Sequence, residues 1–305
     1  MNSSGLDRRT VIKGSLLAAA GLAFAAPGHR VVAGAVPSVP DVKLGNGVTM
    51  PALGFGTYSL RGELCTQSVA DAITAGYRLV DTAKVYENEE AVGAGIRKSG
   101  LDRKSLFVTS KIWVDDSGYD QGKRAFQETL DKLGLDYLDL YLIHRPRGDV
   151  EGSWRAMEEL HRAGKIRAIG ISNFDEGQYA SLMKHAKVKP AVNQLETHPF
   201  FQQGAELASL TAQGVRMEAW SPFAEGRNGL FTHPVLQEIG AKHGKSVAQT
   251  VLRWHHQRGI VVIPRSSNPD HRRENLAIFD FQLDDADMKR IAGLDLNRSQ
   301  FPEWT

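Results

Sequence analysis

The chain has 305 residues, of which 42% are apolar and 24% charged, a balance that excludes disordered and collagen-like proteins. The single cysteine, Cys65, excludes an intramolecular disulfide framework and a cysteine-based metal site, and the ten histidines show no metal-ligand spacing. The net charge of +2 comes from residues 1–35, which hold four basic residues and one acidic one; the 33 basic and 34 acidic residues that remain give no charge excess of the kind that binds nucleic acid or membrane surfaces.

The N-terminal residues are typical of an export signal. A twin-arginine pattern, Arg8 to Lys13, precedes an uncharged stretch from Gly14 to Ala26 that is too short to span a bilayer comfortably. The small-x-small sequence from Ala33 to Ala35 then predicts a cleavage site. We therefore expect residues 1–35 to be a signal peptide for the twin-arginine export machinery and the mature enzyme to be periplasmic, with a cytoplasmic pool left open. The alternatives are a frayed N-terminal helix and a wrongly chosen start codon.

From residue 42 onward the pattern is that of one α/β domain. Two alternating segments around a Gly-Asn-Gly turn, residues 42–50, predict a β-hairpin that plugs the floor of a barrel; a start at Met50 would remove it. Eight aliphatic runs then alternate with amphipathic stretches, and no linker interrupts them, so we predict a single (β/α)8 TIM barrel over residues 36–305. The predicted strands are Leu53–Thr57, Arg78–Thr82, Leu106–Ile112, Leu138–Ile143, Ile166–Ile171, Ala191–Leu195, Arg216–Ala219 and Gly259–Pro264, and the predicted helices include Gln67–Ala75, Glu89–Lys98, Lys123–Leu133, Trp154–Ala163, Glu176–His185 and Ala205–Gln213.

A doubly wound dinucleotide-binding domain is not indicated. Such a domain needs a G-x-G-x-x-G turn directly after its first strand, and the chain has none. Residues 240–246 look like a phosphate-binding loop, but three residues separate the glycines where four are needed, and the segment follows a helix. We interpret it as a turn between two helices.

Ionisable residues end three successive predicted strands. Asp81 ends the second, Lys111 the third and His144 the fourth, and Tyr86 follows Asp81 by five residues. The C-terminal ends of the strands are where the active site of a barrel lies. Because burying an unpaired charge costs several kcal/mol, we expect these side chains to form a mutually paired cluster.

At these residues the sequence resembles the aldo-keto reductase family, and the resemblance covers almost all of residues 42–305. The bacterial branch that includes the 2,5-diketogluconate reductases is the most similar. The segments that match in order and spacing are Asp81–Glu89, Ser110–Trp113, Leu142–Pro146, Gly170–Phe174, Asn193–Gln194 and Ile263–Ser266.

The resemblance implies reduction of an aldehyde or ketone to the alcohol with NADP(H), or with NAD(H), as the cofactor. Tyr86 would be the general acid, His144 would orient the carbonyl group, and Lys111 and Asp81 would tune Tyr86. A phenol with a pKa of about 10 has to release its proton near neutral pH, and a neighbouring ammonium lowers that pKa. Asp81 would keep Lys111 charged, and a neutral His144 would polarise the carbonyl oxygen. None of these groups supplies a hydride, so a nicotinamide must.

The second half of the chain carries the cofactor contacts that the resemblance implies. Trp220 stands where the family usually has a tyrosine stacked on the nicotinamide, and indole offers an equal or larger face. Arg265 replaces the common lysine at the 2′-phosphate, a group that suits a guanidinium. His271 stands where a second basic contact is often arginine, which leaves the preference for NADPH open, and Arg272 is the next candidate. The implied cofactor-binding residues are Thr57, Ser172, Asn173, Gln194, Trp220, Ser221, Phe223, Arg265, Ser266, Ser267, Asn268, His271, Glu274 and Asn275.

The predicted substrate-binding residues are Tyr58, Trp113 and Arg145. The first two match aromatic wall positions of the family, and residues 115–121 and 224–231 are expected to form the rim of the pocket.

Arg145 departs from the family, because many members carry a tryptophan after the histidine. A guanidinium at this place favours a keto-acid or a keto-sugar acid. Alternatively, Arg145 turns outward and pairs with Asp149 or Glu151.

Two other classes of function remain open. A barrel isomerase or aldolase could bind a phosphate near its last strands, but it needs no such cluster. A weakly catalytic regulatory or binding protein on the same fold would keep the cofactor site. We expect a monomer that binds a small-molecule carbonyl substrate and has no nucleic-acid partner, no metal and no stable membrane span.

Overall fold

The computed structural model describes residues 38–304. Each of the eight predicted strands is present in this part of the chain, with ends that differ by one or two residues. The strands are β3 (Gly54–Gly56), β4 (Leu79–Asp81), β5 (Phe107–Ile112), β6 (Leu138–Ile143), β7 (Ile166–Ser172), β8 (Val192–Glu196), β9 (Arg216–Trp220) and β10 (Val261–Val262).

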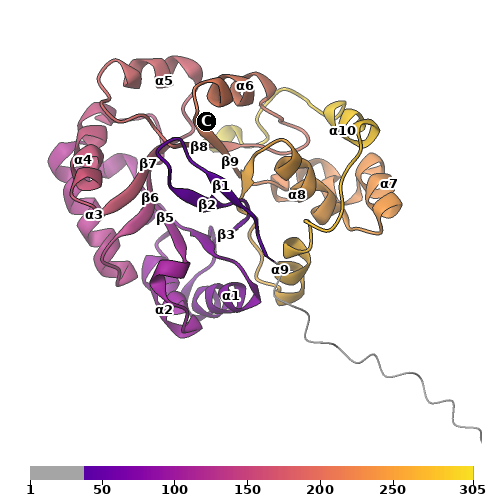
Figure 1. The fold of residues 1–305 in the computed structure, drawn as a ribbon, viewed down its shortest axis with the longest axis horizontal. Coiled ribbons are helices and arrows are strands. Elements are labelled where there is room, and N and C mark those ends of the chain that lie inside the picture. Colours follow the sequence, from indigo (N-terminus) through magenta and orange to yellow (C-terminus); the bar gives the residue numbers. More distant parts are fainter. Residues whose placement is uncertain (1–37, 305) are drawn as a thin grey trace, which may run out of the picture. The chain divides into compact units, whose positions relative to one another are not determined.

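These strands form a barrel. They pair in parallel in sequence order from β3 to β10, and a parallel bridge between Leu53 and Val262 brings the two edges of the sheet together. The backbone NH of Gly56 also donates to the carbonyl oxygen of Pro264 at 3.1 Å. The predicted (β/α)8 architecture is therefore confirmed (Figure 1).

Helices surround the strands, as Figure 1 shows, and the six helices named from the sequence are present. The α-helices are α1 (Gly62–Ala75), α2 (Glu89–Ser99), α3 (Tyr119–Leu133), α4 (Val150–Arg162), α5 (Glu176–Met183), α6 (Gly204–Ala212), α7 (Pro234–His243), α8 (Val247–Gln257), α9 (Pro269–Leu276) and α10 (Asp285–Ala292). Short 3-10 helices are η1 (Lys84–Tyr86), η2 (Arg103–Ser105), η3 (Val114–Asp116), η4 (Ala224–Thr232) and η5 (Pro302–Trp304).

The glycine-rich segment 240–246 joins two helices, as predicted. Gly244 ends α7 in the left-handed conformation (φ 62°), which glycine adopts without steric cost. Ser246 then begins α8 with a capping box, in which its hydroxyl accepts from the backbone NH of Gln249 and the Gln249 side chain accepts from the Ser246 NH. The segment is thus a helix-to-helix turn and not a phosphate loop.

A hairpin of β1 (Asp41–Lys43) and β2 (Thr49–Pro51) lies across the N-terminal end of the barrel (Figure 1). Leu44 and Met50 are buried in one apolar cluster with the first inward-facing residues of the strands. Asn46, in the turn, donates from Nδ2 to the carbonyl oxygen of Arg167 at 3.0 Å. These contacts confirm that the hairpin closes the floor.

Inward-facing side chains change from apolar to ionisable along the strands. On β4, Leu79 packs in the apolar floor cluster, and Asp81, two residues later, faces the same way nearer the C-terminal end. Lys111 on β5 pairs with Asp81, and Glu218 on β9 is linked to Asp81 through Gln194; all three are buried. The chemistry is therefore concentrated at one end of the barrel.

The predicted signal peptide, residues 1–35, lies outside the described residues. Among the helices of residues 38–304, none combines the length and the apolar character that crossing a membrane requires.

Candidate active site

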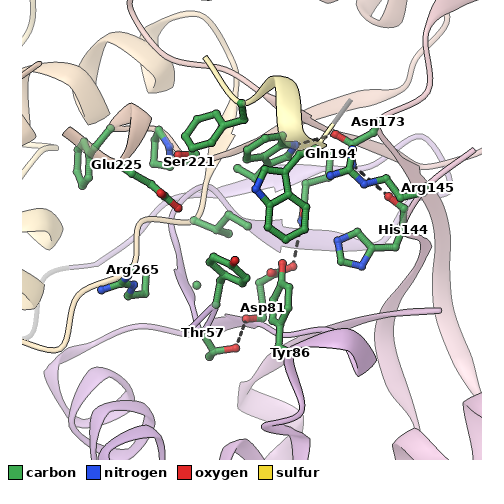
Figure 2. A pocket seen from close by; sticks show the side chains of 18 of the residues that line it. Thr57, Asp81, Tyr86, His144, Arg145, Asn173, Gln194, Ser221, Glu225 and Arg265 are labelled. Atoms are coloured by element: carbon green, nitrogen blue, oxygen red, sulfur yellow. Dashed lines mark hydrogen bonds between the residues drawn. The ribbon is translucent and has the colours of Figure 1, made fainter. Parts of the chain in front are cut away.

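A cavity of about 440 Å³ lies at the C-terminal ends of the barrel strands (Figure 2). Its lining includes twelve of the predicted site residues: Thr57, Tyr58, Asp81, Tyr86, His144, Arg145, Asn173, Gln194, Trp220, Ser221, Phe223 and Arg265. The other seven were not named as site residues, although Glu225 and Phe231 belong to the predicted rim segment 224–231; they are Gly56, Pro222, Glu225, Phe231, Ile263, Phe301 and Trp304.

Asp81 and Lys111 form a buried ion pair beneath the cavity. Lys111 Nζ lies 2.6 Å from Asp81 Oδ1 and donates to the carbonyl oxygen of Thr82 at 2.9 Å. Burial raises the pKa of Asp81, and the Lys111 charge opposes that rise. For Lys111, burial acts to lower the pKa, but Asp81 and Tyr86 outweigh it and the pKa is raised. The predicted pairing is present and keeps the lysine charged.

Helix η1 carries Tyr86 to the same lysine. The Tyr86 hydroxyl lies 3.4 Å from Lys111 Nζ, which is also 5.0 Å from the centre of the phenol ring. Burial raises the pKa of Tyr86, and the positive charge of Lys111 opposes this effect. The lysine therefore acts in the predicted direction, but burial dominates, so the phenol is protonated at neutral pH.

His144 follows β6 and faces the two aromatic rings of Tyr86 and Trp113, with ring centroids 5.8 Å and 5.1 Å away. Burial, assisted by Lys111 and Arg145, holds the pKa of His144 well below its ordinary value, so the imidazole is neutral. Its Nδ1 is buried and has no hydrogen-bond partner among residues 38–304. A proton on Nδ1 would lack an acceptor, so the proton belongs on Nε2, where it can be donated to a substrate oxygen.

Asn173 holds Trp220 on the opposite wall. Asn173 has a left-handed backbone (φ 63°), and its Nδ2 donates to the His144 carbonyl oxygen (3.1 Å) and to Ser172 Oγ (2.8 Å). Its Oδ1 accepts from Trp220 Nε1 at 2.9 Å. Gln194 Nε2 donates to Asp81 Oδ2 at 3.0 Å, which links this wall to the ion pair. The predicted nicotinamide contacts are thus brought together, with an indole face fixed beside them.

The predicted pyrophosphate and 2′-phosphate contacts lie along one side of the cavity. Ser221 Oγ is buried and has no hydrogen-bond partner in the described part of the chain. Arg265 is exposed and lines the cavity (Figure 2). Its Nη2 donates to Ser59 Oγ at 2.8 Å. A buried hydroxyl and an accessible guanidinium leave donors available for phosphate oxygens.

The remaining predicted adenosine contacts lie beyond the cavity lining, on the loop after β10 and on α9. His271 is exposed, whereas Arg272 is buried and bonds Asp71 (3.0 Å) and the Ser266 carbonyl oxygen (3.0 Å). Arg272 is therefore committed to tying α9 to α1, which corrects its interpretation as a reserve phosphate ligand. The residues of this group are Ser266, Ser267, Asn268, His271, Glu274 and Asn275.

Arg145 faces the cavity and does not pair with Asp149 or Glu151. Only 9% of it is exposed, and none of the carboxylates that the structure describes lies within ion-pair distance of its guanidinium. The guanidinium lies 5.6 Å from the centre of the Trp304 ring. Burial lowers its pKa, and the nearby Arg147 acts in the same direction. The site thus holds a buried cation that a substrate anion can neutralise.

The C-terminal tail, residues 297–304, forms a wall of the cavity that the sequence had not indicated. Trp304 meets Tyr58 edge to face at 5.7 Å, and Phe301 lies 5.3 Å from Trp220. Glu196 anchors the tail, because its carboxylate accepts from Ser299 Oγ (2.6 Å) and the Gln300 NH (2.8 Å). The only signal in the sequence is the two aromatic residues among the last five, and nothing there shows where the tail folds.

The two predicted rim segments behave differently. Residues 224–231 supply Glu225 and Phe231 to the lining, as expected. Residues 115–121 supply none, which corrects the prediction for that segment. Lys84 Nζ lies 2.8 Å from Asp116 Oδ1, and Ser153 Oγ accepts from the Gly118 NH at 2.8 Å, so the segment is held against η1 and α4. Trp113, just before it, touches His144 but does not line the cavity.

No group of three or more His, Cys, Asp or Glu side chains in residues 38–304 is arranged to hold a metal ion. The ionisable residues of the cavity are instead paired with one another or face its interior.

Comparison with known proteins gives one family. The profile of the Aldo/keto reductase family matches residues 52–296. Morphine 6-dehydrogenase of Pseudomonas putida is 46% identical over 270 residues, which cover 84% of this chain and 91% of that protein. Glyoxal reductase of Bacillus subtilis (strain 168) is 48% identical over 256 residues, which cover 83% and 92%. The predicted branch is also represented, since 2,5-diketo-D-gluconic acid reductase B of Corynebacterium sp. is 42% identical over 266 residues, covering 86% and 96%.

A solved structure supports the fold and points to a cofactor. The aldo-keto reductase of Bombyx mori, solved in complex with NADP, superposes with a TM-score of 0.83. The aldo/keto reductase of Brucella melitensis superposes with a TM-score of 0.82. The Bombyx chain is 35% identical and the alignment covers 88% of this chain and 97% of that one. The substrates in the names of the relatives differ widely, so similarity alone does not select one.

Proposed function

The chain belongs to the aldo/keto reductase family, and we propose that it reduces an aldehyde or ketone, with Tyr86 giving the proton that completes the alcohol. It is an NADP-dependent oxidoreductase: its relatives are named as reductases, and the similar Bombyx mori structure is bound to NADP. The observation that carries the role of Tyr86 is its place at the cavity surface, 3.4 Å from a lysine that is itself ion-paired to Asp81.

The cavity suits a nicotinamide cofactor. Trp220 offers a ring face held in place by its hydrogen bond to Asn173, Ser221 has an unused buried hydroxyl, and Arg265 presents a guanidinium to a phosphate. When bound, the cofactor supplies the hydride.

The protein's own residues manage charge on the carbonyl oxygen. His144 is neutral and donates from Nε2 to that oxygen, which polarises the carbonyl group. Tyr86 then transfers its hydroxyl proton to the oxygen as negative charge develops there. Lys111 stabilises the phenolate that is left, and Asp81 keeps Lys111 charged and fixed. The contacts of Lys111 with Asp81 and with Tyr86 are already formed.

The variant Tyr86→Phe tests this assignment. It removes the transferable proton and little else, so kcat should fall by about 10²–10⁴-fold while the cofactor still binds. NADPH oxidation would be followed with a panel of aldehydes, ketones and keto-sugars, and NADPH affinity by fluorescence.

Tyr58→Phe is the matched control, because it also removes a phenol hydroxyl from the cavity. Phe126→Tyr would not serve, because Phe126 is buried in the core. A Tyr86→Phe enzyme that keeps more than about a tenth of the wild-type kcat would show that another group gives the proton.

The substrate class follows from Arg145. The guanidinium has a fork of donors, no carboxylate partner among the described side chains and a place on the cavity wall. We therefore infer that the preferred substrate carries a carboxylate or many hydroxyl groups near its carbonyl, as a keto-acid or keto-sugar acid does.

We also propose that residues 1–35 direct the folded enzyme to the periplasm through the twin-arginine route and that the enzyme acts as a monomer. Twin-arginine transport accepts folded proteins, so NADP can cross while bound. Replacing Arg8 and Arg9 by lysine should retain the enzyme in the cytoplasm. An unchanged distribution between the two compartments would contradict the interpretation of residues 1–35 as a signal.

Sedimentation of the mature chain tests whether the enzyme is a monomer.

A further inference from the structure

One buried carboxyl group of the barrel has no part in the mechanism above. Glu218, on β9, is fully buried, and its Oε2 accepts a hydrogen bond of 2.8 Å from Gln194 Nε2. The same nitrogen donates to Asp81 Oδ2 at 3.0 Å, so the two carboxyl groups share one amide. Glu218 Oε1 has no partner among the described residues. A buried carboxyl with an unpartnered oxygen destabilises a fold, so its presence beside the ion pair calls for a functional reason.

The cluster contains two acids and one cation. Asp81 and Lys111 are the charged groups that act on Glu218, and Lys111 is in direct contact with Asp81. Two neighbouring carboxyl groups with a single cation cannot both ionise cheaply. Burial, with the charge of Asp81, raises the pKa of Glu218 to about 8. At neutral pH the pair therefore carries one negative charge, on Asp81.

The orientation of the Gln194 amide follows from this arrangement. Asp81 is ionised and accepts hydrogen bonds only, so the NH2 group of Gln194 must face it. Its two N–H bonds are used by Asp81 and Glu218, which leaves Gln194 Oε1 as an acceptor without a partner in the described protein. Gln194 lines the cavity.

We propose that Glu218 is a positioning residue of the nicotinamide site, which fixes the Gln194 amide with its oxygen toward the cofactor and, on ionising, favours the oxidised cofactor over the reduced one. The inference rests on the proposed function, because it takes the cavity beside Gln194 to hold the nicotinamide. The oxidised ring is positively charged and the reduced ring is neutral. A new negative charge at Glu218 therefore attracts NADP⁺ and does not attract NADPH.

The test measures the dissociation constants of NADPH and NADP⁺ by tryptophan fluorescence. The pH is varied between about 6.5 and about 9.5, a range that lies on both sides of the raised pKa of Glu218. In the wild type, the ratio Kd(NADPH)/Kd(NADP⁺) should rise about fivefold as the pH passes 8, the size expected of one partly screened charge. Both cofactors carry the same 2′-phosphate, so its titration cancels in the ratio.

Glu218→Gln is the matched neutral variant and should make the ratio independent of pH, because its amide oxygen still accepts from Gln194 but cannot ionise. Glu218→Leu removes the acceptor, so it should weaken both cofactors several-fold at pH 7 and leave the affinity for 2′-phospho-ADP-ribose, which lacks nicotinamide, unchanged. Glu89→Gln alters a buried carboxyl that bonds Ser110 instead, and it should keep the wild-type pH dependence.

A Glu218→Gln protein with the wild-type pH dependence would overturn the proposal, as would a folded Glu218→Leu protein with unchanged cofactor affinity. Wild-type binding of NADPH together with either result would leave the proposed function standing. Absence of NADPH binding in the wild type would overturn both. Circular dichroism reports whether Glu218→Leu folds, and Glu218→Gln decides the matter if it does not.

Discussion

The residues proposed for proton transfer and the wall of the cavity proposed to face the substrate are held in place by different means. Asp81 and Lys111 are buried on neighbouring strands and form an ion pair of 2.6 Å. Arg145 and Trp304, in contrast, lie on a loop and on the C-terminal tail, and they meet through a ring contact of 5.6 Å. Barrel strands fix side chains tightly, whereas loops and tails vary easily. Under the proposed function, a change at Arg145 or Trp304 alone alters the preferred substrate and leaves the reaction unchanged.

The largest effect is expected from breaking the ion pair of Asp81 and Lys111. Asp81→Asn leaves the charge of Lys111 buried without a counter-ion, and breaking such a pair costs about 3–5 kcal/mol of stability. Without its partner, Lys111 has its pKa lowered by burial and loses its charge at a lower pH. We expect kcat to fall by at least about 10²-fold, as for loss of an acid–base group. Urea unfolding and the pH profile of kcat measure the two effects.

The double variant Asp81→Asn, Lys111→Met sharpens the same comparison. Removing both charges leaves no unpaired ion, so the free energy of unfolding should recover most of what the single variant lost, while kcat stays low. Recovery of activity along with stability would mean that the pair serves the fold and not the reaction.

Arg265, the proposed phosphate contact on the loop after β10, should affect the KM for NADPH and not the KM for NADH. Arg265→Ala removes a charged hydrogen bond worth about 1.5–3 kcal/mol, so KM for NADPH should rise about tenfold to a hundredfold, with little change for NADH. Arg273→Ala, which removes an exposed guanidinium paired with Asp270 on α9, is the control. Equal losses for both nucleotides would place the discriminating contact elsewhere.

The loop after β6 should control selectivity and leave the reaction intact. Arg145→Trp is expected to lower kcat/KM for a carboxylated carbonyl substrate about tenfold relative to an uncharged one, since a charged hydrogen bond of about 1.5–3 kcal/mol is lost. Arg145→Lys keeps the charge but loses the fork of N–H donors, so its ratio of kcat/KM values should lie between those of the wild type and Arg145→Trp. The same ratio of kcat/KM values in wild type and Arg145→Trp would show that Arg145 does not select the substrate.

The tail should give the smallest change. Trp304→Ala removes the ring beneath Arg145 and a face of Tyr58, contacts worth about 0.5–2 kcal/mol for a cation over an aromatic ring. We expect KM for the substrate to rise a few-fold at unchanged kcat, with Leu296→Ala, an exposed apolar residue before the tail, as the control. A fall in kcat with KM unchanged would mean that the tail affects proton transfer. It would contradict the proposed difference between the Asp81–Lys111 pair and the wall that holds Arg145 and Trp304.

Hydrophobic periodicity and a few strand-end residues were enough to predict the barrel, its hairpin floor and the placing of Asp81, Lys111 and His144 at one end. Side-chain direction alternates along a strand, and the C-terminal ends of parallel strands share one edge, so these positions follow from local pattern. Family resemblance added the implied cofactor contacts, seven of which, out of fourteen, line the cavity. These parts depend on interactions that are short-range or common to every barrel.

The tertiary structure alone decided the rest. It placed Trp304 against Tyr58, and it turned Arg145 inward and committed Arg272 to Asp71. It also set Glu218 beside Asp81 through a glutamine from a third strand. Each of these contacts joins residues far apart in the chain, and whether a charge is buried, paired or free depends on what long-range packing brings next to it. A single sequence holds the partners of such a contact but not the distance between them.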